Sequence, residues 1–389
     1  YQIDGSRNDY VEKSKESRYC YKNREKISFL FSVLERTKHW EEKQMKALVK
    51  TARGAGNVEV CNVPEPELIN EHSVIIKVKA CSVCGTDVHV WQDKFMYWPP
   101  VTLGHEFSGE IVKTGSKCQN FKVGDRIVAE PQINNCGGCE FCRSGREHMC
   151  TKKLTLGWRV NGGMAEYVSI QERFLHRIPD ALSFKLAALC EPLAVAVYSI
   201  AERGKIKMND FVVVQGSGPI GILSAFMAKQ LGARYVLLTG IDASEQVRFG
   251  VAKQLGADYV LNIQRENLKE KVMELTGGKG ADVVIETSGA NSAISGAVSL
   301  LKRNGSIIGI GIPANDTTPF PWKDAVLNSL DISFSMSTSY TSWDKALGLL
   351  TQHGDVLQNI ITWSGGIEDW ERVFNSLVSE TDVKAVFTF

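Results

Sequence analysis

The sequence carries almost no net charge and no long apolar run. Lysine and arginine total 45 against 44 aspartate and glutamate residues, so the formal charge is +1. There is no basic stripe interleaved with aromatic residues, which argues against nucleic-acid binding. No run of about 18 apolar residues occurs, so we expect no membrane-spanning helix. Internal repeats and low-complexity linkers are also lacking, which argues against a solenoid or a long disordered connection.

Length and composition favour a globular protein of two domains. The chain has 389 residues, of which 43% are apolar and 23% are charged, and such a chain can bury a substantial core. The apolar stretch ISFLFSVL at residues 27–34 follows basic residues, but it is too short to cross a bilayer and no small-residue cleavage site follows it. We therefore expect a soluble, cytoplasmic protein whose ten cysteines stay reduced.

Residues 1–44 differ from the rest of the chain by their alternating charges. The stretch MKALVKTARGAG, which begins at Met45, has the composition of a domain start. The preceding EEKQ would be encoded largely by purines, as a ribosome-binding site is, so residues 1–44 are either translated upstream sequence or a native N-terminal helix or arm. Neither interpretation gives the segment a chemical role.

The pattern of apolar residues changes near residue 195. Before it, short β-branched runs such as HSVIIKVKAC and FSGEIVKTG are separated by Gly, Pro and Asp, which predicts a mainly β domain. After it, near-continuous apolar runs such as FVVVQG and YVLLTG alternate with helical stretches such as ILSAFMAKQLGA, which predicts a doubly wound parallel sheet. The chain then ends in a helix-rich segment and the strand-like VKAVFTF. The predicted fold class is α/β.

A glycine-rich loop lies between a predicted strand and a predicted helix. VVVQGSGPIGILSAF places Gly216 where a tight turn is needed, Gly218 where backbone approaches a pyrophosphate, and Gly221 where helix and strand pack closely. The N-terminus of the helix then offers unpaired N–H groups to the anion. This loop predicts a dinucleotide site.

The second strand of that unit bears on the choice between NAD and NADP. An acidic residue is expected at its tip to hold the ribose hydroxyls, and in YVLLTGIDASEQVR the carboxylate of Asp242 follows the tip by two residues. If Asp242 reaches the ribose, NAD is favoured. If it does not, Gly240 leaves room for a 2′-phosphate that Arg248 would meet. The sequence leans slightly towards NAD.

Four cysteines lie within 15 residues of one another in NNCGGCEFCRSGREHMC. These are Cys136, Cys139, Cys142 and Cys150. The spacing lets four thiolates surround one tetrahedral ion. An iron–sulfur cluster is the main rival, and a disulfide knot is disfavoured in a reducing compartment. Because four protein ligands leave no open position, a zinc ion held here would be structural.

A second group of residues fits an open metal site. Cys84 in CSVCGTDVHVW offers a thiolate, His105 in LGHEFSG an imidazole, and Glu106 and Glu191 offer carboxylates. Two or three protein ligands with an exchangeable position are what a catalytic zinc needs, because that position must accept an alcohol or carbonyl oxygen. Each residue alone is also compatible with an ordinary buried thiol, a core histidine or a surface carboxylate. Their joint occurrence with a nucleotide loop favours the metal.

Over essentially Met45–Phe389 the chain resembles the zinc-dependent medium-chain dehydrogenases/reductases, the superfamily of zinc alcohol, sorbitol and threonine dehydrogenases. GHEFSGEIVKTGSKC fits its zinc signature, and the four-cysteine spacing matches its structural-zinc lobe. The resemblance implies a GroES-like catalytic domain over 45–195 and 333–389 and a Rossmann domain over 196–332. It makes Glu191, in CEPLA, the third catalytic ligand as in the polyol group, with Cys190 as the adjacent alternative. It also makes Asp87 the carboxylate that orients His105.

The resemblance further implies reversible oxidation of an alcohol, with zinc acting on the substrate oxygen and hydride passing to the nicotinamide. Thr86 and His89 would relay the proton to solvent. By the same resemblance, the nucleotide site adds the following residues to the three glycines: Pro219, Ile220, Gly289, Ile310 and Ile312.

The substrate is predicted less sharply. Sorbitol dehydrogenases usually carry a tyrosine after the relay histidine and an arginine in the last sheet strand, where this chain has Val90 and Ser335. Threonine dehydrogenases resemble CGTDVH but usually lack EPLA. We therefore expect a polyol or sugar-alcohol dehydrogenase, with a threonine 3-dehydrogenase-like or other secondary-alcohol enzyme as the alternative. A non-catalytic nucleotide-binding protein is a third interpretation. The resemblance also implies a homodimer or homotetramer, with no nucleic-acid or membrane partner.

Overall fold

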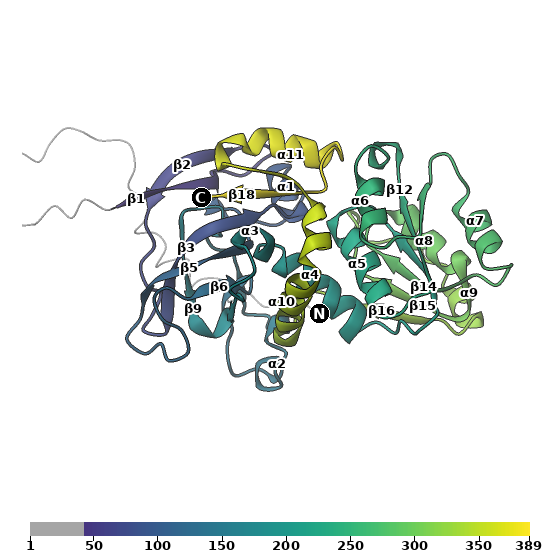
Figure 1. The fold of residues 1–389 in the computed structure, drawn as a ribbon, viewed down its shortest axis with the longest axis horizontal. Helices are drawn as coiled ribbons and strands as arrows, with labels where there is room; N and C mark the ends of the chain where they lie inside the picture. Colours follow the sequence, from purple (N-terminus) through teal and green to yellow (C-terminus); the bar gives the residue numbers. More distant parts are fainter. Residues whose placement is uncertain (1–42) are drawn as a thin grey trace, which may run out of the picture. The chain divides into compact units, whose positions relative to one another are not determined.

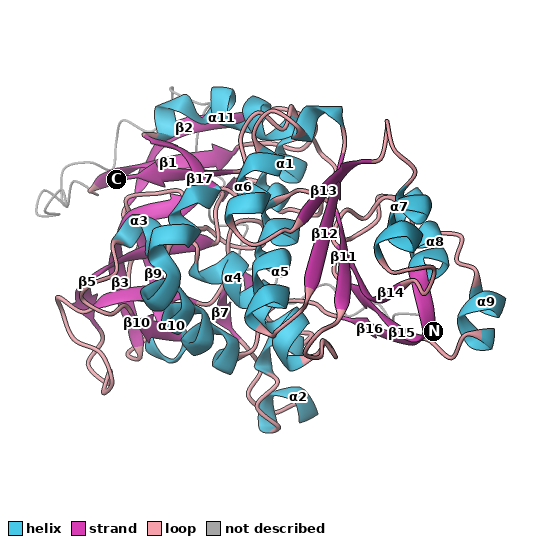
Figure 2. Ribbon diagram, turned by 45° about the vertical axis from the view of Figure 1, so that its right-hand side comes forward, coloured by secondary structure: helices cyan, strands magenta, loops and turns pink. Residues whose placement is uncertain are grey.

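The second half of the described chain is built on a six-stranded parallel sheet. The computed structural model describes residues 43–389, so the predicted N-terminal extension, residues 1–44, lies outside the described residues except for its last two. The strand order is β13-β12-β11-β14-β15-β16 (Figures 1 and 2). The strands are β11 (Phe211–Gln215), β12 (Tyr235–Gly240), β13 (Tyr259–Asn262), β14 (Ala281–Glu286), β15 (Leu301–Gly309) and β16 (Asp331–Phe334). This is the doubly wound parallel sheet that the apolar runs predict.

Helices cover both faces of this sheet because its central strands are apolar on both sides. On β11, Val212 and Val214 pack into the core that includes residues of α5, whereas Phe211 and Val213 pack into the core that includes residues of α7 and α8. The helices are α5 (Pro219–Gln230), α6 (Arg248–Gln254), α7 (Leu268–Leu275), α8 (Asn291–Leu300) and α9 (Trp322–Leu327), with the short turn η5 (Asp242–Ser244) after β12. We call this part the nucleotide lobe.

The first half is mainly β, as predicted. A three-stranded sheet has the order β2-β1-β4, a two-stranded sheet pairs β7 with β8, and the largest sheet has the order β10-β6-β5-β3-β18-β17, with β9 also paired to β3. The strands are β1 (Gln44–Lys50), β2 (Val58–Pro64), β3 (Ser73–Ser82), β4 (Val101–Thr102), β5 (Glu106–Thr114), β6 (Arg126–Ala129), β7 (Gln132–Asn134), β8 (Leu154–Thr155), β9 (Tyr167–Gln171), β10 (Leu175–Arg177), β17 (Ile361–Gly365) and β18 (Lys384–Thr388). The C-terminal strands thus complete the sheet of the first half. We call this part the catalytic lobe, and its exact boundaries stay a prediction.

Helices join the two lobes. α10 packs against α4, and α4 packs against α5 of the nucleotide lobe. The helical segments of this part are α1 (Gly85–Trp91), α2 (Glu140–Arg143), η2 (Glu147–Met149), η3 (Glu172–Phe174), α3 (Phe184–Ala187), α4 (Cys190–Ala196), η4 (Val197–Glu202), α10 (Tyr340–Leu357), η6 (Gln358–Ile360), η7 (Ile367–Asp369) and α11 (Trp370–Val378). One apolar core, which includes Leu193, Ile222 and Leu350, runs through this junction.

The sequence predicts no membrane-spanning helix, but the helical stretch Phe184–Glu202 is an exception by length and composition. By length and composition alone it is apolar enough to cross a bilayer, but 72% of its apolar window is buried inside the protein. The sequence scan missed it because polar residues interrupt the apolar positions. Such burial is typical of a helix in the core of a globular protein.

Candidate metal and coenzyme sites

Three of the predicted metal ligands converge where β3 leads into α1. Cys84 is the N-cap residue of α1, and His105 directly precedes β5. The antiparallel pairing of β3 with β5 sets Ser82 opposite Glu106, which brings these two segments together. Potential ligand atoms of Cys84, His105 and Glu106 all lie within 4.8 Å of one another.

Asp87 holds the two ligand-bearing segments through their backbone. One carboxylate oxygen accepts the N–H of Cys84 at 2.9 Å, and the other accepts the N–H of Gly104 at 3.1 Å. Asp87 Oδ1 also lies 3.9 Å from Nδ1 of His105, which is within ion-pair range but beyond hydrogen-bonding distance. Asp87 therefore positions Cys84 and His105 chiefly through main-chain groups.

The carboxylate of Glu106 faces the metal site and also pairs with the buried ammonium of Lys384. Its Oε1 accepts a hydrogen bond from Lys384 Nζ at 2.7 Å, and its Oε2 accepts one from the Ser82 hydroxyl. Both Glu106 and Lys384 are almost fully buried. Burial raises the pKa of Glu106, but the charges of Lys384 and His105 outweigh it and hold the pKa below its usual value. Lys384 thus competes with a metal for this carboxylate.

Glu191 is the uncommitted carboxylate of the site. It lies in the first turn of α4, is 8% exposed, and makes no hydrogen bond or ion pair within residues 43–389. Burial raises its pKa to about 7, and the charge of His105 acts in the opposite direction. Glu191 does not belong to the group of three residues whose ligand atoms lie within 4.8 Å of one another. The charges of His105, Glu106 and Lys384 nevertheless influence its pKa. Cys190, the alternative ligand, is buried and donates to the carbonyl of Trp343 instead.

The donor set fits zinc. Thiolate, imidazole and carboxylate are the ligands that zinc takes in proteins. Burial, followed by the charge of Glu106, raises the pKa of the Cys84 thiol, and a bound cation would reverse this by favouring the thiolate. The buried Nδ1 of His105 has no hydrogen-bond partner within the described part of the chain. A cation here would satisfy an otherwise unfavourable cluster of buried groups.

The predicted relay residues sit beside this site. The hydroxyl of Thr86 is buried without a partner among the described residues, so it is free to bond a substrate. His89 lies on the wall of a cavity further along α1. Burial and the charge of Lys94 lower its pKa. Val90, by contrast, is a buried core residue of α1, so a substrate contact at that position is not seen.

The four cysteines of the predicted cluster lie close enough together to bind one metal ion. The sulfur of Cys142 lies 3.5 Å from that of Cys139 and 3.9 Å from that of Cys136, and all four sulfurs lie within 4.8 Å of one another. A tetrahedron with zinc–sulfur bonds of about 2.3 Å places sulfurs about 3.8 Å apart. Backbone N–H groups lower the pKa of Cys136 to about 6, which favours its thiolate. This is a structural four-cysteine zinc site.

The glycine loop has the geometry that a dinucleotide needs. Gly216 has φ +114, a conformation that favours glycine. A Cβ at Gly218, the N-cap of α5, would meet nothing within 4 Å, so the space before it is open to a ligand. A Cβ at Gly221 would clash with the carbonyl oxygen of Gly216. Pro219 and Ile220 follow in the first turn of α5, whose N–H groups are available to an anion.

The two residues considered for a 2′-phosphate contact, Gly240 and Arg248, both have protein neighbours. A Cβ at Gly240 would lie 2.6 Å from side-chain atoms of both Phe249 and Ser244, so the space on that side of the residue is filled. Arg248 pairs with Glu380 at 3.0 Å and donates to the carbonyls of Leu377 and Asp382. Its guanidinium therefore ties the nucleotide lobe to the catalytic lobe.

Asp242 follows the tip of β12, as predicted. Its side chain is 54% exposed and pairs with Arg265 at 2.8 Å. On the nicotinamide side, Gly289 has φ +67 and a Cβ there would contact the backbone of Ile312. Ile310 is partly buried and Ile312 is 72% exposed. The predicted coenzyme contacts of Asp242, Gly289, Ile310 and Ile312 stay predictions.

Sequence reasoning missed two residues of the metal site. Lys384 begins the strand-like VKAVFTF, and a lysine inside an otherwise apolar strand was the available signal. Trp158 packs edge-on against His105, with ring centroids 4.9 Å apart, and nothing in its local sequence distinguishes it. Both come from segments distant in sequence from Cys84.

Comparison with known proteins agrees with this geometry. Residues 70–180 match the alcohol dehydrogenase GroES-like domain family, and residues 219–352 match the zinc-binding dehydrogenase family. A sorbitol dehydrogenase from Halalkalibacterium halodurans is 38% identical over 88% of this chain and 99% of its own. An L-threonine 3-dehydrogenase from Burkholderia thailandensis is 32% identical over 88% of this chain and 98% of its own.

Among solved structures, a zinc-binding dehydrogenase from Sinorhizobium meliloti bound to NADP superimposes with a TM-score of 0.79, at 29% identity, over 89% of this chain and 100% of its own. The part that matches the GroES-like domain family, residues 70–180, contains the four cysteines as well as Cys84 and His105. The chain belongs to the zinc-containing medium-chain alcohol dehydrogenase family and is an NAD(P)-dependent oxidoreductase of alcohols or polyols.

Proposed function

We propose that the protein oxidises a secondary hydroxyl of a polyol or sugar alcohol with NAD. The observation that carries this proposal is the unpaired, buried carboxylate of Glu191, which lies near enough to Cys84 and His105 to influence them electrostatically. CEPLA implies that the third protein ligand is a carboxylate. A carboxylate at this position is typical of the polyol group. The sorbitol dehydrogenase relative supports the same substrate class.

The residues around the site have separate tasks in this reaction. Zinc, when bound, supplies a Lewis acid for the substrate oxygen, and the nicotinamide accepts the hydride. Cys84, His105 and Glu191 would hold the metal, while Glu106 stays with Lys384. The unpartnered hydroxyl of Thr86 would take the substrate proton and pass it towards His89, which a lowered pKa keeps neutral near pH 7 and thus able to accept it.

The coenzyme preference rests on the tip of β12. The side chains of Phe249 and Ser244 fill the space beside Gly240, and Arg248 is already bound. A 2′-phosphate therefore finds no unpaired arginine at Arg248, which supports NAD over NADP.

The test is a set of initial rates with zinc-replete protein. We expect a polyol such as sorbitol or xylitol to be oxidised faster than L-threonine or 2,3-butanediol, and NAD to be preferred to NADP. The variant Cys84→Ser should lose the activity, while Cys61→Ser, at a cysteine outside both clusters, should keep it.

A second candidate is the oxidation of L-threonine, which the 32% identical threonine dehydrogenase and the CGTDVH stretch favour. Turnover confined to L-threonine would select it and reject the polyol. A protein that binds NADH but turns over none of these alcohols would favour the non-catalytic interpretation.

We also propose a cytoplasmic homo-oligomer. All nine described cysteines are free, as a reducing compartment would keep them. Six large apolar side chains stand exposed around the edge strand β16, and we call them the edge patch: Ile312, Trp322, Val326, Leu327, Phe334 and Met336. An exposed apolar patch at an open sheet edge favours pairing with a second copy.

A further inference from the structure

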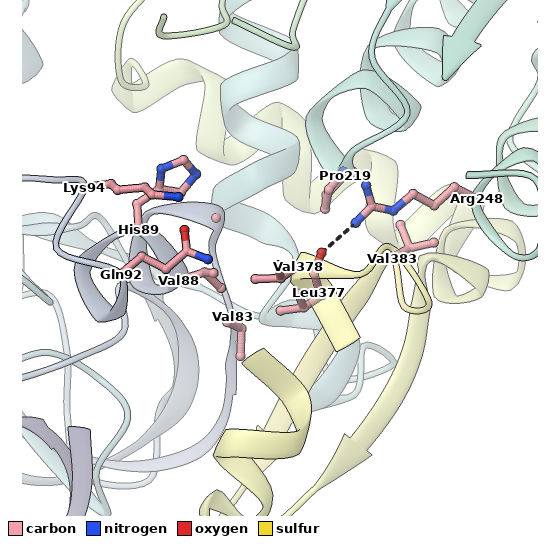
Figure 3. Close-up of a pocket in the computed structure, with 11 residues that line it drawn as sticks. Val83, Val88, His89, Gln92, Lys94, Pro219, Arg248, Leu377, Val378 and Val383 are labelled. Atoms are coloured by element: carbon pink, nitrogen blue, oxygen red, sulfur yellow. Dashed lines mark hydrogen bonds between the residues drawn. The ribbon is translucent and has the colours of Figure 1, made fainter. Parts of the chain in front are cut away.

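A cavity between the two lobes contains a cation that the functions above do not use. The cavity has a volume of about 300 Å³. His89 and Lys94 line it from the catalytic lobe, and Pro219 and Arg248 line it from the nucleotide lobe (Figure 3). Leu377 and Val378 from α11 close another side. Because Pro219 opens helix α5 after the glycine loop, this cavity is where the phosphates of a dinucleotide would lie.

A pyrophosphate brings two negative charges into this cavity, and the N-terminus of α5 supplies only partial positive charge. The two other basic side chains on the cavity wall, Arg248 and His89, are poor partners for the phosphates. Arg248 is already paired with Glu380 and bound to two carbonyl oxygens. Burial, with the nearby charge of Lys94, lowers the pKa of His89, so this side chain is mostly neutral near pH 7. Arg248 and His89 therefore leave the phosphates without a free cation.

Lys94 is the cation that remains. Its side chain is exposed, and its ammonium makes no hydrogen bond or ion pair within residues 43–389. The nearest acid in sequence, Asp93, forms no ion pair with it among the described residues, and its carboxylate accepts a hydrogen bond from the hydroxyl of the buried Tyr97. An ammonium has three donors, and here all three are available to an anion.

The backbone holds Lys94 at this place. Its N–H donates to the carbonyl of His89 at 2.8 Å, and the N–H of Asp93 donates to the carbonyl of Val90 at 3.2 Å. Asp93 adopts φ +60, which turns the chain sharply after α1. Figure 3 shows Lys94 beside His89 and across the cavity from Pro219. The turn thus fixes the base of the lysine on the wall opposite the helix N-terminus.

We propose that Lys94 binds the pyrophosphate of the coenzyme. The inference rests on the proposed dehydrogenase function and adds a coenzyme-binding residue to it. Lys94 and the N–H groups of α5 approach the phosphates from opposite lobes, so the bound coenzyme joins the lobes through its charged centre. Neither the glycine fingerprint nor the metal ligands contain this residue.

The test measures coenzyme binding without a substrate. NADH binding is followed by its fluorescence and ADP-ribose binding by calorimetry, for the wild-type protein, Lys94→Gln and Lys94→Arg. We expect Lys94→Gln to raise both dissociation constants about tenfold, since a charge-assisted hydrogen bond is lost. Added NaCl should weaken wild-type binding more steeply than binding by Lys94→Gln. Lys94→Arg should restore most of the affinity.

The matched control is Lys185→Gln, an exposed lysine on α3 that is not among the residues lining the cavity; its affinities should equal those of the wild type. If Lys94→Gln binds NADH and ADP-ribose as tightly as Lys185→Gln does, the inference is wrong while the dehydrogenase function stands. An equal loss in Lys94→Gln and Lys94→Arg, or an unchanged salt dependence, also rejects a phosphate contact. Wild-type protein that binds neither ligand would instead contradict the proposed function.

Discussion

At the scale of single residues, the two carboxylates of the metal site differ in their partners. Glu106 is neutralised by Lys384 within a buried pair, and such a pair is costly to break because one charge would be left unpaired. Glu191 has no such partner, and burial raises its pKa to about 7. We infer that Glu191 is free to bind a cation, whereas Glu106 must first release Lys384.

The pKa of Glu191 predicts how metal binding depends on pH. Below pH 7 its carboxyl is protonated in the metal-free protein, so a metal must displace one proton. From pH 7 to pH 6, the affinity of the catalytic site should therefore fall about fivefold more for the wild type than for Glu191→Gln. Above pH 7 the two affinities should change in parallel. The measurement is a titration with Co²⁺, followed by the charge-transfer absorption of the single thiolate, between pH 6 and pH 8.

The raised pKa of Glu191 also affects the free energy of unfolding. Its pH dependence has the opposite sign to that of a carboxylate whose pKa is lowered by an ion pair. Because the folded pKa lies above the ordinary value of 4.5, the native state holds the proton between these two values and the unfolded state does not. The free energy of unfolding of the metal-free protein should therefore fall as the pH rises from about 4.5 to about 7. If the Co²⁺ affinities of the wild type and Glu191→Gln change in parallel at all pH values, Glu191 does not bind the metal.

At the scale of elements, the loop between β7 and β8 depends on its cysteines. Its only regular structure is the four-residue helix α2 and the three-residue turn η2. Its buried side chains are two of the cysteines and His148, which is too little apolar surface for an independent core. A metal supplies the folding energy that such a segment lacks.

Removal of one ligand should therefore unfold this loop and spare the rest of the chain. We expect Cys139→Ser to lower the bound zinc by one ion per chain and to make residues 135–153 sensitive to proteolysis. NADH binding should change less than twofold, because the glycine loop lies in the other lobe. Zinc content and limited proteolysis measure this, with Cys61→Ser as the control. A variant that keeps its full zinc content would show that the four thiols hold no zinc.

At the scale of the whole molecule, the C-terminal strand and the two lobes build the site. The strand β18 returns to pair with β3 and carries Lys384 to Glu106. The turn before it carries Glu380 to Arg248 and to the hydroxyl of Ser244 in η5 of the nucleotide lobe. These contacts fix the metal site on one side of the cavity and the glycine loop on the other.

The edge patch predicts the oligomeric state. We expect the protein to be a dimer or a larger assembly at micromolar concentration, because pairing through β16 would cover Trp322, Leu327 and Phe334, each more than 65% exposed. Light scattering after size-exclusion chromatography measures the mass. Trp322→Lys should shift it towards the monomer, whereas Met208→Lys, at an exposed methionine outside the patch, should not. A wild-type monomer at all concentrations would reject the proposal.

Features whose parts lie close together along the chain can be predicted from the amino-acid sequence. The glycine loop and the four cysteines each fall within a short segment, so spacing alone fixes the turn and the ligand geometry. The parallel sheet was also readable, because strands buried on both faces are apolar at every position. Cys84 and His105 were found as a pair through their motifs.

Only the tertiary structure decided what depends on distant segments. Lys384 meets Glu106 across 278 positions, and Lys94 faces Pro219 across the junction of two lobes. It also showed that Arg248 pairs with Glu380, that Phe249 and Ser244 pack beside Gly240, and that Val90 belongs to the core. Such contacts follow from the pairing of strands and the packing of helices, and these are set by the burial of apolar surface over the whole chain and not by the residues next to each site.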